Sequence, residues 1–252
     1  MACSTAFVEE TEGSVNSWLM RGVFVLLAYV STLLGSTLLG AVLATVQSST
    51  FGLDLGLRSS VAAAAAPAAV PTILVVGDSL SAGYGIDVNQ GWVALMERRL
   101  KSQGYGYRVV NASVSGETSA GARSRLPRLF ELHKPAIMIL EIGANDGLRG
   151  LPLAQTRENL KVMLDLAAKS QTKALLVGMQ IPPNYGAQYA DGFAALFSEQ
   201  AKTRQLPYVP FFLDGVALDM SLMQPDGLHP KAIAQPRLLD NVWTALAPVL
   251  KK

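Results

Sequence analysis

Hydrophobic positions along this chain form one long uncharged stretch near the start, followed by a series of short runs. No charged residue occurs from Gly22 to Leu53, and residues 22–46 are apolar over more than the about 20 residues that cross a bilayer. Ser59–Pro71 then consists of small residues and proline, a composition typical of a linker or a cleavage region. We therefore expect residues 1–70 to be a signal or anchor segment with its linker, and residues 71–252 to be the folded domain.

After residue 71, short apolar runs alternate with segments of helical periodicity. The predicted strands are Ile73–Val76, Tyr107–Ala112, Ala136–Ile142, Ala174–Met179 and Tyr208–Leu213; the predicted helices are Trp92–Leu100, Ala120–Leu132, Thr156–Ala168, Phe193–Thr203 and Asp240–Leu250. Pro127 should kink or restart the second of these helices. Strands that alternate with helices in this way predict a parallel sheet with right-handed crossovers. The expected fold is α/β, with a five-stranded, flavodoxin-like sheet in a three-layer α/β/α arrangement.

Three of the predicted strands end in short polar or glycine-containing turns, which carry Ser79, Gly116 and Asn145. In an open parallel sheet the carboxyl ends of the strands share one edge, and ligands bind there. A serine at that edge, beside the N–H groups of a helix start, is well placed to be a nucleophile. Taken alone, the turn with Ser79 is more often the serine cap of an ordinary helix.

A fourth polar turn, Asp226–Pro230, follows the last predicted strand and contains His229. A serine nucleophile needs a base, and histidine suits that task because its unperturbed pKa is near 6.5. Asp226 is close enough in sequence to orient the imidazole, and the backbone N–H groups of Ser79 and Gly116 with the Asn145 amide could stabilise an oxyanion. The only other histidine, His133, lies at a predicted helix end and is expected to be a solvated capping residue.

Four sequence blocks occur in a set order: GDSLS at 77–81, SGETS at 115–119, GAND at 143–146 and DGLH at 226–229. In this order they resemble the blocks of the GDSL, or SGNH, hydrolases, and the surrounding sequence is similar to the bacterial thioesterase, lysophospholipase and arylesterase branch. The resemblance implies a nucleophile at Ser79, an oxyanion hole from Ser79, Gly116 and Asn145, and Asp226 with His229 as the base pair. It also implies an exported, periplasmic or secreted hydrolase of acyl esters and thioesters that needs no metal or other cofactor.

A proline-containing loop after the fourth strand, with Pro183, Asn184 and Tyr185, should lie at the same sheet edge and line the acyl channel. A rigid surface turn is the alternative for this loop. Gln180 stands where relatives of this branch are expected to have an arginine, which leaves the substrate preference open. The natural substrate, the acyl-chain length and the oligomeric state do not follow from the sequence.

Composition narrows the remaining classes of function. The only cysteine is Cys3, so an intradomain disulfide, a thiol nucleophile and a cysteine metal site are excluded from residues 71–252. Basic residues are scattered and the formal net charge is only +2, which argues against a nucleic-acid partner. A nucleotide-binding module is disfavoured, because Gly83-x-Gly85-x-x-Val88 only approaches the dinucleotide fingerprint, which ends in Gly or Ala. A carbohydrate O-acetylesterase and a non-catalytic binding protein of the same fold remain the alternatives to a serine esterase, and membrane association through residues 22–46 is possible if they are not cleaved.

Overall fold

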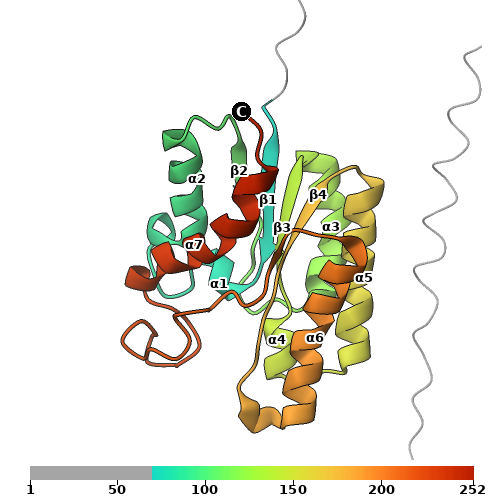
Figure 1. Cartoon of the computed structure of the whole chain (residues 1–252), viewed down its shortest axis with the longest axis vertical. Helices are drawn as coiled ribbons and strands as arrows, with labels where there is room; N and C mark the ends of the chain where they lie inside the picture. The colour runs from blue at the N-terminus through green and yellow to red at the C-terminus, as the bar shows by residue number, and fades with distance from the viewer. Residues whose placement is uncertain (1–69) are drawn as a thin grey trace, which may run out of the picture. The chain divides into compact units, whose positions relative to one another are not determined.

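A parallel sheet of five strands forms the centre of the domain (Figure 1). The computed structural model describes residues 70–252, so the expectations for residues 1–69 lie outside the described residues. The strands are β1 (Thr72–Gly77), β2 (Arg108–Asn111), β3 (Ile137–Glu141), β4 (Lys173–Val177) and β5 (Tyr208–Val209). Their spatial order is β2-β1-β3-β4-β5, and every pairing is parallel. This is the flavodoxin-like order, so the predicted fold class is confirmed.

Helices cover both faces of the sheet (Figure 1). The helices α2 (Trp92–Ser102) and α7 (Gln235–Leu246) pack together on one face, while α3 (Ser119–His133), α5 (Leu153–Lys169) and α6 (Ala187–Arg204) cover the other. Every residue of β1 and β3 is buried, as expected for central strands with helices on both sides. Two very short helices, α1 (Ser79–Ala82) and α4 (Ala144–Leu148), follow β1 and β3 directly at the carboxyl edge of the sheet.

The structure differs from the sequence-based expectation at several elements. Helix α3 runs through Pro127 as one continuous helix and does not restart, because buried Leu126 and Phe130 fix both halves to the core. The last strand ends at Val209, because the ladder with β4 shifts there: the next N–H to reach the Gly178 carbonyl is that of Phe212, at 2.9 Å. Helices α6 and α7 begin earlier than predicted; Gln235 at the start of α7 is buried and accepts a hydrogen bond of 3.0 Å from the Trp92 N–H.

Short 3₁₀ turns complete the description: Val88–Gln90, Pro183–Tyr185, Ala232–Ala234 and Ala247–Val249. Among the helices that the structure describes, none is both long and apolar enough to cross a bilayer. The apolar stretch at residues 22–46 is outside the described part of the chain.

Candidate functional site

The carboxyl end of β1 turns directly into α1, and this turn positions Ser79. Asp78 is the N-cap of α1, and its Oδ1 accepts a hydrogen bond of 3.0 Å from the Leu80 N–H. Ser79 is therefore the first residue of the short helix, half-buried at the edge of the sheet. The Asp78 side chain is fully buried beneath the turn, whereas Ser79 is partly exposed.

Ser79, His229 and Asp226 form one line of hydrogen bonds. The Oγ atom of Ser79 lies 2.8 Å from Nε2 of His229, and Nδ1 of the same ring lies 2.7 Å from Oδ2 of Asp226. The other carboxylate oxygen, Oδ1, accepts from the backbone N–H groups of Leu228 and His229 at 2.9 and 3.0 Å. These hydrogen bonds, led by the one from the imidazole, lower the pKa of Asp226 to about 2. The carboxylate is thus ionised at neutral pH, and the sequence-predicted residues meet although 150 positions separate Ser79 from His229.

The loop that carries His229 is held against the α1 region by residues that sequence reasoning did not single out. The Gln224 N–H donates to the His229 carbonyl at 2.7 Å, and the Gln224 side-chain amide donates to the carbonyls of Tyr84 and Pro230 at 2.8 and 3.2 Å. The Tyr84 ring also packs on the imidazole, with ring centroids 4.5 Å apart. The sequence alone does not reveal these contacts, because they join the segment with Tyr84 to the loop with His229, which lie far apart in the sequence.

Gly116 and Asn145 approach the same turn from neighbouring segments. The Val114 N–H donates to the Gly77 carbonyl at 3.0 Å, which places the turn that carries Gly116 beside the end of β1. Gly116 has φ of +77°, a conformation that favours glycine. The side-chain Nδ2 of Asn145 lies 3.3 Å from Oδ2 of Asp78, next to Ser79 in the chain. Within residues 70–252, neither the Ser79 nor the Gly116 backbone N–H donates to another protein group.

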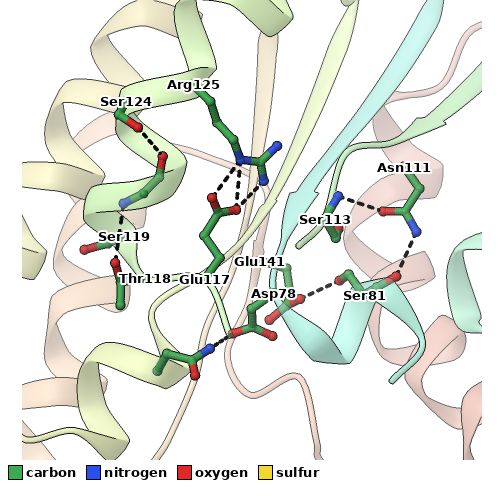
Figure 2. A network of polar contacts seen from close by, with 12 residues as sticks. Asp78, Ser81, Asn111, Ser113, Glu117, Thr118, Ser119, Ser124, Arg125 and Glu141 are labelled. Carbon is green, nitrogen blue, oxygen red and sulfur yellow. Dashed lines mark hydrogen bonds and ion pairs between the residues drawn. The ribbon is translucent and has the colours of Figure 1, made fainter. Parts of the chain in front are cut away.

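Two buried carboxyl groups, Asp78 and Glu141, stand at the ends of β1 and β3 (Figure 2). Burial raises the pKa of Asp78 to about 6, against hydrogen bonds and the imidazole charge that lower it. Glu141, at the end of β3, has its pKa raised well above the ordinary value by burial and then by the charge of Asp78. The Ser81 hydroxyl accepts from Trp92 Nε1 at 3.2 Å and donates to Oε2 of Glu141 at 2.5 Å. Gly77 makes room for this contact, since a Cβ there would lie 2.6 Å from the same oxygen.

Asp146 bridges α4 to the start of α3. Its carboxylate accepts hydrogen bonds from the backbone N–H and the hydroxyl of Ser119 at 2.8 and 2.5 Å, and from the Thr156 hydroxyl at 3.2 Å. All three residues are buried. The role of Asp146 is therefore to tie elements of the fold together.

The predicted substrate loop lies next to α4. Residues Pro183–Tyr185 form a 3₁₀ turn, and the Tyr185 hydroxyl donates to the Leu148 carbonyl at 2.9 Å. Asn184 is exposed. The small crevice beside Ser79 includes none of these three loop residues; it is lined by Leu80, Gly83, Tyr84, His229, Pro230 and Gln235.

Comparison with known proteins identifies the family. The sequence profile of the GDSL-like lipase/acylhydrolase family matches residues 75–235. The chain belongs to this family. Esterase TesA of Pseudomonas aeruginosa is 52% identical over 183 residues, which cover 73% of this chain and 91% of that protein. The thioesterase 1/protease 1/lysophospholipase L1 of Escherichia coli K12 is 39% identical over 183 residues, covering 73% and 86% of the two chains.

Solved structures of relatives have the same fold. The crystal structure of TesA superposes with a TM-score of 0.69 at 52% identity, over 70% of this chain and 98% of that one. The esterase EstA from Pseudoalteromonas, solved with monoethylphosphonate as inhibitor, gives a TM-score of 0.68 at 37% identity, over 70% and 97% of the chains. The resemblance inferred from the four sequence blocks is thus confirmed at the level of family and fold.

Proposed function

We propose that this protein is a serine esterase that hydrolyses carboxylic esters through an acyl-enzyme on Ser79. The observation that carries the proposal is the unbroken hydrogen-bond line from the Ser79 hydroxyl through the His229 ring to the Asp226 carboxylate. Family membership and relatives named as an esterase, an arylesterase and a thioesterase support the same chemistry.

His229 acts as the general base and then as the general acid. As Ser79 Oγ attacks the ester carbonyl carbon, Nε2 of His229 accepts the hydroxyl proton. When the tetrahedral intermediate collapses, the bond to the alcohol or thiol breaks and the leaving group takes that proton, which leaves an acyl-serine. A water molecule then repeats the sequence: it gives a proton to Nε2, attacks the acyl carbon, and releases the acid as Ser79 recovers its proton.

Asp226 sets the tautomer that this step requires. Its Oδ2 accepts a hydrogen bond from the Nδ1–H of His229, so that Nε2 presents a lone pair to the serine hydroxyl. The two backbone N–H groups on Oδ1 keep the carboxylate in that orientation. Because Asp226 stays ionised, it also stabilises the imidazolium that forms during attack.

The oxyanion is stabilised by the Ser79 and Gly116 N–H groups and by the Asn145 amide. An amide nitrogen carries two hydrogens, and Asn145 uses one for Asp78. The second hydrogen remains for the substrate oxygen. Loss of a single donor of this kind typically lowers kcat by about 10²–10³.

The substrates we propose are small acyl esters and thioesters, with Pro183, Asn184 and Tyr185 beside the acyl group. Relatives named as an esterase and as a thioesterase support both classes of substrate. A series of p-nitrophenyl esters and CoA thioesters, from acetyl to palmitoyl, measures this preference. A strict requirement for acetyl would instead favour a carbohydrate O-acetylesterase.

For the whole chain, we propose that residues 1–70 direct export and that residues 71–252 are the catalytic domain. The support is the uncharged stretch at residues 22–46 and the small-residue linker after it. N-terminal sequencing of protein recovered from outside the cytoplasm tests this proposal. A start near residue 71 indicates cleavage, whereas a retained stretch in a membrane fraction indicates an anchor; recovery only from the cytoplasm contradicts export.

Hydrolysis of p-nitrophenyl butyrate by a Ser79→Ala variant tests the proposed function. Without the hydroxyl no acyl-enzyme can form, so we expect kcat to fall by at least about 10³. Ser102→Ala is the matched control, because Ser102 only donates to the Arg99 carbonyl on the exposed side of α2. Turnover by Ser79→Ala at the rate of the control would refute the assignment, and a wild-type chain without turnover on any ester of the series would favour a binding protein.

A further inference from the structure

Short helix α4 contacts two segments around Ser79, the turn after β1 and the turn before α3. At its start, Asn145 donates to Asp78, the residue before Ser79. One residue later, Asp146 accepts from Ser119 at the start of α3. At its C-cap, Nη2 of Arg149 donates to the Gly116 carbonyl at 3.0 Å. The proposed mechanism gives Asn145 a direct role and leaves Arg149 without one.

The segment that follows Gly116 is held firmly by other contacts. Glu117 forms an ion pair with Arg125 on α3 (Figure 2). The Thr118 side chain accepts from the Gly121 N–H as the N-cap of α3, and Ser119 is bound to Asp146. Removal of the Arg149 side chain should therefore leave residues 117–119 in place and change only the glycine before them.

Gly116 has less to hold it. Glycine adopts positive and negative φ about equally readily, so the observed φ of +77° is not enforced by the residue itself. Besides the hydrogen bond from the Val114 N–H to the Gly77 carbonyl at its base, the structure gives two contacts that restrict this turn: the hydrogen bond of 3.2 Å from the Glu117 N–H to the Val114 carbonyl, and the one from Arg149 to the Gly116 carbonyl. A rotation of the turn would redirect the Gly116 N–H, which is the proposed oxyanion donor.

We propose that Arg149 is a positioning residue, which holds Gly116 in the left-handed conformation so that its N–H is aligned for the oxyanion. The inference rests on the proposed function. The main evidence for this role of Arg149 is that it donates to the Gly116 carbonyl from the end of the same short helix that presents Asn145. Helix α4 thus couples two oxyanion donors, Asn145 directly and Gly116 through Arg149.

The test is the steady-state kinetics of Arg149→Met on p-nitrophenyl butyrate, a neutral substrate. A misaligned donor stabilises the transition state less, and it affects the bound ground state little. We therefore expect kcat to fall about 10-fold while KM changes less than about 2-fold. The Arg149 side chain is exposed, and the midpoint of thermal unfolding should stay within about 2 °C of wild type. Arg98→Met is the matched control, because exposed Arg98 lies away from the site and also donates to a backbone carbonyl. That hydrogen bond, to the Asn89 carbonyl, is 2.9 Å long. The control should keep the wild-type kcat.

Salt separates positioning from a direct effect of the arginine charge. The interaction of an exposed charge with the oxyanion is screened between about 50 and about 500 mM NaCl, whereas the alignment of a backbone turn is not. We expect the ratio of wild-type to Arg149→Met kcat to be the same at both concentrations. A wild-type kcat in Arg149→Met, a change confined to KM, or a ratio that disappears at high salt would overturn the inference while the esterase assignment stands. If Ser79→Ala in the same assay matches wild type, the esterase assignment fails and this inference fails with it.

Discussion

Replacement of Asp226 by asparagine should reverse the tautomer of His229. Two backbone N–H groups point at Oδ1, and only an oxygen can accept both. The asparagine side chain will therefore keep its oxygen at that position and turn its NH₂ group toward Nδ1 of His229. The ring must then carry its proton on Nε2, the atom 2.8 Å from Ser79 Oγ, and can no longer accept the serine proton.

The size of the effect follows from the hydrogen bonds that change. Reaction in the variant requires the original tautomer, in which an amide N–H faces an imidazole N–H across the 2.7 Å contact. The lost charge-assisted hydrogen bond is worth about 1.5–3 kcal/mol, and two opposed donors cost about 1–3 kcal/mol more. The barrier should rise by about 3–6 kcal/mol, or about 10²–10⁴ in kcat. Because 38% of the Asp226 side chain is exposed and water can relieve part of this cost, we expect about 10³.

Saturating p-nitrophenyl butyrate gives kcat for Asp226→Asn, Asp226→Ala and the control Asp219→Asn. Asp219 makes the same kind of local turn, accepting from the N–H and hydroxyl of Ser221, and has no contact with His229. The alanine variant should be less impaired than the asparagine variant, because water can replace the carboxylate and leaves the tautomer free. An asparagine variant within tenfold of wild type, or one more active than alanine, would refute the tautomer argument.

Three further outcomes are expected. Because His229 must be uncharged to accept the proton, kcat/KM should rise with pH between about 5 and about 8; a flat profile would argue against a histidine base. Burial raises the pKa of Glu141, so above the ordinary value of 4.5 the carboxyl ionises in the unfolded chain before it ionises in the folded protein. The free energy of unfolding therefore falls as pH rises. The thermal midpoint of Glu141→Gln should accordingly rise relative to wild type between about pH 5 and about pH 8, and a constant difference would contradict the raised pKa. Gly77→Ala should lower the free energy of unfolding by about 1–3 kcal/mol, since its Cβ would lie 2.6 Å from Glu141 Oε2. Urea unfolding measures this loss; Gly106→Ala, whose Cβ meets nothing within 4 Å, is the control, and equal losses in the two variants would contradict the packing argument.

The sequence was sufficient to predict the parallel sheet because β1, β3 and β4 contain continuous apolar runs, of which those of β1 and β3 end in polar turns. A buried strand leaves that signature in its own residues. The starts of α6 and α7 were missed because they depend on contacts with remote segments. Gln235 at the start of α7 is an example. A polar residue is usually expected at the surface, yet Gln235 is buried, where its side chain accepts a hydrogen bond from the Trp92 N–H.

The site shows the same division between local and remote information. Ser79, Gly116 and Asn145 could be proposed because each follows a strand, and His229 because it stands in a motif with Asp226. The contact between Arg149 and Gly116 and the contact between Gln224 and Tyr84 were not predictable, since each joins segments with no shared pattern. The burial of Glu141 was also hidden, because a carboxylate that ends a strand is more often solvated.

Covalent labelling with a fluorophosphonate, followed by peptide mass spectrometry, tests the central claim most directly. The reagent bonds to a serine whose hydroxyl is activated by a neighbouring base, so the wild-type chain should carry one phosphonyl group on the peptide that contains Ser79. His229→Ala should react at least about 10²-fold more slowly, because the base is missing. A label on any other residue, or labelling of His229→Ala at the wild-type rate, would contradict the account.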